Sequence, residues 1–73
     1  MSRLNFVETD GKVIGSLDDG SFKVRLNNGH ELIATLSGRL RLNQVAVCTG
    51  DHIMIHVSPY DLSTGHIVWR YND

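Results

Sequence analysis

The feature that most constrains the fold is a strict alternation of apolar and polar residues near the middle of the chain. Phe22, Val24 and Leu26 are apolar, and the residues between them are polar. A period of two is typical of a half-buried β-strand. Asn28-Gly29 follows at once and fits a type I′ hairpin turn, which needs two residues that tolerate positive φ. Segment 30–36 then fits the return strand, so the sequence predicts a hairpin.

Further strands are predicted on both sides of this hairpin. Segment 6–17 is rich in Val, Ile, Thr and Phe, and the glycines at positions 11 and 15 indicate bends or bulges within one long strand. Segment 52–58 alternates again. The last strand is predicted at 66–71, after a structured loop over 58–65 that Pro59 and Gly65 bound. Asn72 and Asp73 are expected to form a tail.

The connection between the third and fourth strands is predicted to be helical. Residues 39–44 fit one or two helical turns, with Ser37 as the N-cap. Leu40 and Val47 suit a plug under a barrel, whereas the run 45–48 is compatible with helix or strand. Five short strands avoid open edges by closing into a barrel. The order of elements therefore predicts an all-β, five-stranded oligonucleotide/oligosaccharide-binding (OB) barrel, as a single domain over residues 1–73. An SH3-like barrel is the alternative, and the helical connection favours the OB barrel.

The charge distribution gives a weaker signal. Seven Lys and Arg residues against eight Asp and Glu give a formal net charge of −1, which does not by itself indicate a nucleic-acid binder. Segment 32–50 contains Arg39 and Arg41 and no acidic residue, so it is locally positive. A solvated connection would explain two arginines equally well. Protonation of the four histidines would take the net charge towards +3.

Catalytic, metal and membrane functions find little support. Cys48 is the only cysteine, so it can form no internal disulfide, which suits a reducing cytoplasm; within its apolar run a buried, inert thiol is expected. His52 and His56 would share one face of a strand but lie about 13 Å apart, too far for one Zn²⁺. The longest apolar run, 45–48, is far shorter than the ~20 residues of a membrane span. We therefore expect no enzyme, no metal and no cofactor.

The aromatic residues leave the question of nucleic-acid binding open. OB barrels that bind single strands combine basic grooves with aromatic platforms for bases. Phe22 lies among aliphatic residues, so a core position is expected. Tyr60 follows a proline in the loop and could either anchor that loop or stack on a base. The alternation does not decide which face of the last strand, around Trp69, is buried.

Four segments, at matching spacing from about Asn5 to Tyr71, closely resemble the bacterial-type translation initiation factor one family. They are Asn28-Gly29-His30, Ser37-Gly38-Arg39-Leu40-Arg41-Leu42-Asn43, Thr49-Gly50-Asp51 and Ser58-Pro59-Tyr60-Asp61-Leu62-Ser63-Thr64-Gly65. The resemblance implies a five-stranded OB barrel. It also implies a cytoplasmic, non-enzymatic factor that binds the small ribosomal subunit at the A site, contacts ribosomal RNA and a neighbouring ribosomal protein, blocks premature tRNA binding and assists the other initiation factors. We expect a monomer.

The resemblance also indicates which residues bind RNA. The basic residues of the family's helical connection match Arg39 and Arg41, and the arginine of its last strand matches Arg70. Tyr60 matches the family's loop, and His52 and His66 stand where members are often basic. A generic single-stranded RNA binder of the cold-shock type and a divergent second copy that serves as a protein-interaction module remain the alternatives.

Overall fold

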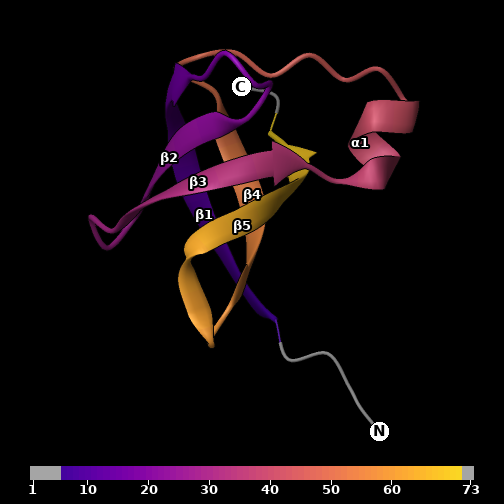
Figure 1. Ribbon diagram of the computed structural model, residues 1–73. Helices are drawn as coiled ribbons and strands as arrows, with labels where there is room; N and C mark the ends of the chain where they lie inside the picture. Colours follow the sequence, from indigo (N-terminus) through magenta and orange to yellow (C-terminus); the bar gives the residue numbers. More distant parts are fainter. Residues whose placement is uncertain (1–5, 72–73) are drawn as a thin grey trace, which may run out of the picture.

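Five strands and one helix follow one another along the chain in the predicted order (Figure 1). The structure is a computed structural model, which describes residues 6–71; the expected tail at Asn72 and Asp73 lies outside this range. The elements are β1 (Val7–Ser16), β2 (Phe22–Leu26), β3 (Glu31–Leu36), α1 (Gly38–Leu42), β4 (His52–Ser58) and β5 (Asp61–Arg70). The strands form a closed barrel in the order β1-β2-β3-β5-β4, which confirms the all-β OB architecture.

The inward positions of the alternating strands form the core. Val13, Ile53, Ile55 and Ile67 have no exposed surface, and Phe22 packs against this cluster as a partly buried residue, as predicted. Closure depends on β1, which pairs with β2 on one side and with β4 on the other. A register shift between Val13 and Gly15 bends β1, in agreement with the predicted bulge.

The turn of the central hairpin differs from the prediction. A type I′ turn would need positive φ at both Asn28 and Gly29. Gly29 has φ of 91°, but Asn28 does not have positive φ, because Gln44 is the only non-glycine residue among residues 6–71 that does. The N–H of Gly29 donates to the carbonyl of Leu26 at 2.9 Å, and the N–H of Leu26 donates to the carbonyl of His30 at 2.8 Å. This is a three-residue loop that ends in a left-handed glycine, and type I′ was wrong. The Asn28 side chain favours it by accepting from the His30 N–H at 2.9 Å.

The last strand begins earlier than predicted. β5 starts at Asp61 instead of His66, and the predicted loop over 58–65 shrinks to a turn at Pro59 and Tyr60. The Asp61 carboxylate accepts hydrogen bonds from the N–H and hydroxyl of Ser63, at 3.1 and 2.6 Å. These bonds order a polar, exposed segment whose composition resembles a loop, so the pattern of alternation missed it.

The connection between β3 and β4 contains the predicted helix. Ser37 caps α1 by accepting from the Leu40 N–H at 3.3 Å, and Leu40 is only 2% exposed. Val47 packs on the core as a partly buried residue, and the run that it belongs to is neither helix nor strand. Cys48 is exposed, so the expected burial of its thiol was wrong. The run is too irregular to turn all its apolar side chains inward.

The elements divide the molecule into two ends (Figure 1). The helix end carries α1 and the last residues of β5. The turn end carries the start of β1 and the β4–β5 turn. Within residues 6–71, no helix has the length and apolarity that crossing a membrane requires.

Candidate nucleic-acid interface

Two of the predicted arginines are presented by α1. Because Leu40 is buried between them, Arg39 and Arg41 both lie on the exposed side of this short helix. Two carbonyls of this helix accept backbone hydrogen bonds from residues that follow it. The Asn43 N–H donates to the Arg39 carbonyl at 3.0 Å, and the Val45 N–H donates to the Leu40 carbonyl at 3.0 Å. The buried leucine and these two hydrogen bonds therefore hold the arginine side chains towards solvent.

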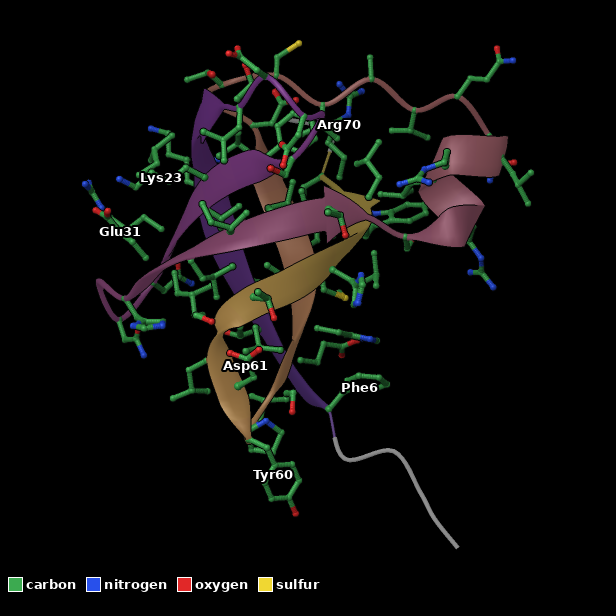
Figure 2. All side chains as sticks on the ribbon, in the orientation of Figure 1. Phe6, Lys23, Glu31, Tyr60, Asp61 and Arg70 are labelled. Carbon is green, nitrogen blue, oxygen red and sulfur yellow. The ribbon has the colours of Figure 1, made fainter. Side chains whose placement is uncertain are left out.

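The third predicted arginine lies beside this helix. Arg70 ends β5, and its Nη1 lies 3.7 Å from Oδ2 of Asp51. Arg70 lines a small hollow together with Leu40, Val45 and Trp69, so the helix and the end of β5 are neighbours. Figure 2 shows Arg70 at the helix end of the barrel. All three predicted arginines are therefore gathered at one end of the molecule.

The alternation of residues in the sequence did not decide whether Trp69 faces the core or the solvent. Its side chain is 51% exposed, and with Arg39, Met54 and Tyr71 it lines a second hollow on the outer face of β4 and β5. The reason is a bulge: Met54 pairs with Trp69 but Ile55 pairs with Ile67, so Val68 is an extra residue. The bulge reverses the alternation, and Trp69 points outward although Ile67 points inward.

Polar contacts border this second hollow. The Tyr71 hydroxyl donates to Oδ1 of Asp10 at 2.7 Å, and this hydrogen bond raises the pKa of Tyr71. Glu8 also lines the hollow, and its Oε2 lies 2.9 Å from Nε2 of His56. The ring of Phe6 stacks on His56 with 5.5 Å between ring centroids. The outer face therefore combines aromatic surface with both signs of charge.

The predicted histidines lie on the same outer face. His66 pairs with His56 across the β4–β5 ladder, and its Nδ1 lies 3.2 Å from the Thr35 hydroxyl. His52 begins β4, is exposed and pairs with Lys12 of β1. Both lie within the sheet surface that continues from Trp69.

Tyr60 is the exception among the predicted residues. It lies in the β4–β5 turn, 85% exposed, at the turn end and away from Arg70 (Figure 2). The structure therefore brings together five of the six predicted residues on the helix end and the adjoining outer face, and leaves Tyr60 apart. We call Arg39, Arg41, Trp69 and Arg70 the arginine surface.

The model of the translation initiation factor 1A / IF-1 family matches residues 3–73. The chain belongs to this family. A solution structure of the translation initiation factor of this type from the Wolbachia endosymbiont strain TRS of Brugia malayi is similar, with a TM-score of 0.78 and 32% identity over 92% of this chain and 79% of that chain. The crystal structure of YjeQ from Thermotoga maritima aligns with a TM-score of 0.74 over 90% of this chain and 23% of that chain. At 19% identity, that second likeness shows the barrel fold alone.

The β2–β3 face is the other basic region of this initiation factor chain. Nη2 of Arg25 lies 2.8 Å from Oε2 of Glu31, and Nζ of Lys23 lies 3.5 Å from Oε1 of the same carboxylate. The hydrogen bond from Arg25 is the main cause that lowers the pKa of Glu31. Figure 2 shows Lys23 and Glu31 on the side of the barrel away from α1. One carboxylate thus offsets much of the positive charge of this face.

No group of three or more His, Cys, Asp or Glu side chains in residues 6–71 is arranged to hold a metal ion. The arginine surface offers groups that can recognise a nucleic acid. Guanidinium groups pair with phosphate oxygens, and the indole offers a flat face for a base.

Proposed function

We propose that the chain binds the small ribosomal subunit at the decoding A site during initiation, through ribosomal RNA contacts of the arginine surface. Bound there, it blocks premature tRNA binding and assists the other initiation factors. It acts in the cytoplasm as a monomeric binding protein, with no catalytic step. The observation that carries the proposal is the half-exposed Trp69 beside Arg39 and Arg70, in a chain of the initiation factor family.

The physical basis is a combination of charge and stacking. Each arginine can pair bidentately with phosphate oxygens, and stacking on an aromatic side chain contributes about 1–3 kcal/mol per base. Arg39 and Arg41 are available to phosphates, whereas Arg70 is shared with Asp51, so about two to three phosphates are neutralised and the slope of log K against log salt is roughly −1.5 to −3. This slope is shallow, so shape complementarity to folded RNA has to contribute much of the affinity.

His52 and His66 extend the same surface along the outer face of the barrel. Each adds a positive charge only when it is protonated, so their contribution to phosphate binding is conditional. Tyr60 lies at the other end, where it would contact RNA that reaches around the molecule. We therefore expect its removal to have a smaller effect than the removal of an arginine.

Cosedimentation with purified small ribosomal subunits tests the proposal, with and without the other initiation factors. We expect saturable, one-to-one binding that the other factors strengthen. Footprinting of the ribosomal RNA in the same complexes should protect nucleotides of the A site. Binding without such protection would contradict the proposed position.

A generic single-stranded RNA binder is the second candidate. The exposed Trp69 and the stacked pair of Phe6 and His56 favour it, since such aromatic surface is sequence-tolerant. Trp69 is the only tryptophan, so quenching of its fluorescence reports binding of RNA to this surface directly. Affinity for short unstructured RNA equal to that for subunits would support this alternative over the initiation factor.

A further inference from the structure

Four outward residues form a continuous row across the outer face of the barrel. They are direct neighbours where β1 pairs with β4, where β4 pairs with β5 and where β5 pairs with β3. In this order they are Glu8, His56, His66 and Thr35, and we call them the histidine row. The Cβ atoms of directly opposite residues in an antiparallel pair lie about 4.5–5.5 Å apart. The two histidine side chains, on β4 and β5, are therefore adjacent.

Hydrogen bonds at the two ends of the row hold both imidazole rings. Oε2 of Glu8 lies 2.9 Å from Nε2 of His56, and the Thr35 hydroxyl lies 3.2 Å from Nδ1 of His66. The Phe6 ring stacks on His56 at an interplanar angle of 20°. A carboxylate accepts from a neutral or a charged imidazole, and a hydroxyl can donate or accept. Both contacts can therefore persist when the rings gain a proton.

Protonation reverses the formal charge of the row. With neutral imidazoles, the row carries the negative charge of Glu8, whereas two protonated rings outweigh this carboxylate and leave the row positive. Two further charged groups border it. Arg39 of α1 lines the same hollow as Glu8 and His56, and Asp10, the next charged residue of β1, accepts from the Tyr71 hydroxyl. The formal charges of these two offset each other, so the imidazoles decide the sign of the charge here.

The row adjoins the arginine surface. Arg39 and Trp69 line the hollow that His56 also lines. A phosphate next to one that pairs with Arg39 would therefore meet the row. A protonated imidazole donates from both ring nitrogens, and phosphate oxygens accept. Among residues 6–71, Nδ1 of His56 and Nε2 of His66 engage no partner, so each can donate to a ligand.

We propose that the histidine row is a proton-linked phosphate site, which binds an RNA phosphate when its imidazoles are protonated and repels it when they are neutral. Binding takes up protons from solution, so the affinity for RNA rises as the pH falls from about 8 to about 6. The proposal rests on the proposed function only in taking RNA as the ligand. It adds Glu8 and His56 to the residues that govern RNA binding.

Binding of a short oligouridine to the free, full chain tests the site, with the fluorescence of Trp69 as the signal. At constant ionic strength, we expect about tenfold higher affinity at about pH 6 than at about pH 8. Calorimetry near pH 6.5, in two buffers of different ionisation enthalpy, counts the protons taken up on binding. We expect about 0.5–1 proton per chain.

Two variants each remove one ring from the row. His66→Gln and His56→Gln keep an amide that can hydrogen-bond to Thr35 or Glu8, and each should reduce the pH effect to about threefold or less and halve the proton uptake. Glu8→Gln removes the negative charge of the row and should strengthen binding at about pH 8 by about threefold.

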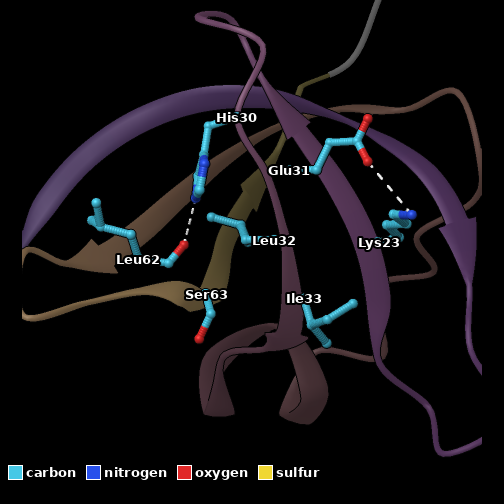
Figure 3. Close-up of a pocket in the computed structure, with 7 residues that line it drawn as sticks. All are labelled: Lys23, His30, Glu31, Leu32, Ile33, Leu62 and Ser63. Atoms are coloured by element: carbon cyan, nitrogen blue, oxygen red, sulfur yellow. Dashed lines mark hydrogen bonds and ion pairs between the residues drawn. The ribbon is translucent and has the colours of Figure 1, made fainter.

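His30→Gln is the matched control. This ring lies at the end of the β2–β3 turn, where its Nε2 is 2.7 Å from the carbonyl oxygen of Leu62 (Figure 3). It is another exposed histidine with one ring nitrogen engaged, and it lies outside the row. The variant should leave both the pH effect and the proton uptake unchanged.

Four results would overturn the site. They are the absence of proton uptake, a pH effect as large in both row variants as in His30→Gln, no binding of oligouridine at about pH 6, and full displacement of oligouridine by millimolar inorganic phosphate at the same ionic strength. The last would assign the row to a free anion instead of RNA. Because these measurements need no ribosome, their failure leaves the proposed function intact. Failure of cosedimentation alone leaves the histidine row intact.

Discussion

The molecule has two basic regions of similar charge, and they differ in what surrounds the cations. On the β2–β3 face, Lys23 and Arg25 share the carboxylate of Glu31, with Arg25 at 2.8 Å. On α1, Arg39 and Arg41 have no carboxylate partner among residues 6–71, and the helix carries no acidic residue in its first turn. The first region compensates its own charge, whereas the second presents its charge to solvent.

The net charge of −1 averages over the whole chain and does not reflect this difference between the two regions. Binding to phosphates depends on cations that lose no existing partner when the ligand arrives. A cation that is already hydrogen-bonded to a carboxylate has to exchange one charged partner for another, and the net gain is small. The position of a few carboxylates therefore decides which cations are available to a phosphate.

Removal of the two helix arginines should have the largest effect. We expect Arg39→Ala/Arg41→Ala to weaken small-subunit binding by about 100-fold or more, because hydrogen bonds to charged groups contribute about 1.5–3 kcal/mol each. Cosedimentation at fixed salt measures the change. The slope of log K against log salt should also become shallower by about 1.5–2.

Lys23→Ala/Arg25→Ala is the matched control, since it removes the same charge from the other region. We expect its affinity to change by no more than about threefold. Equal losses for the two double variants would remove the distinction between the regions. A salt slope unchanged in the first variant would show that these arginines do not contact phosphates.

Trp69 should have the next largest effect. Trp69→Ala removes the stacking face and should weaken subunit binding by about tenfold, while Trp69→Phe should retain most of the affinity. Cosedimentation measures both variants, and circular dichroism verifies that the half-exposed side chain is dispensable for folding. If alanine and phenylalanine bind equally well, the residue contributes no stacking.

The architecture could be predicted because the signals for its strands and for the helix cap are local in sequence. Period-two segments bounded by turn residues give five strands, and the inward residues of those segments, such as Val24 and Ile55, are the ones that are buried. The Ser37 cap and the buried Leu40 likewise follow from neighbours along the chain. Alternation and capping act over a few residues, so they can be recognised without the tertiary structure.

The remaining features depend on partners far apart in sequence. Trp69 faces outward because a bulge in the β4–β5 ladder reverses the alternation, and no residue type near Val68 signals that bulge. Pairing of Asp61 with Ser58 turns a loop-like composition into a strand. Neutralisation of Lys23 and Arg25 by Glu31 requires the register of β2 against β3. The arginines of the site were predicted through resemblance, and their role in RNA binding stays a prediction.

A smaller effect is expected at His66, which extends the arginine surface along the outer face. His66→Arg replaces a conditional charge with a permanent one and should strengthen subunit binding by about three- to tenfold at neutral pH, equivalent to about one added phosphate contact. Cosedimentation measures the gain. His30→Arg, at the end of the β2–β3 turn, adds the same charge outside the arginine surface and should change the affinity little. A gain from both variants would indicate nonspecific attraction.

The smallest effect is expected from Glu31→Gln, which removes the carboxylate that makes the β2–β3 face differ from the arginine surface. Release of Lys23 and Arg25 should raise subunit affinity by no more than a few fold, and make the salt slope slightly steeper.

The same variant tests the contribution of this ion pair to the stability of the fold. Because Arg25 lowers the pKa of Glu31 below the ordinary value of 4.5, the ion pair stabilises the fold above pH 4.5 and loses this contribution as the pH falls through the lowered pKa. Urea unfolding should therefore find Glu31→Gln slightly less stable than the unchanged chain near pH 7, with the difference vanishing in strong acid. If the stability difference between the two proteins persists when the carboxylate is protonated, Glu31 acts through packing. Its charge would then not explain the contrast between the two basic regions.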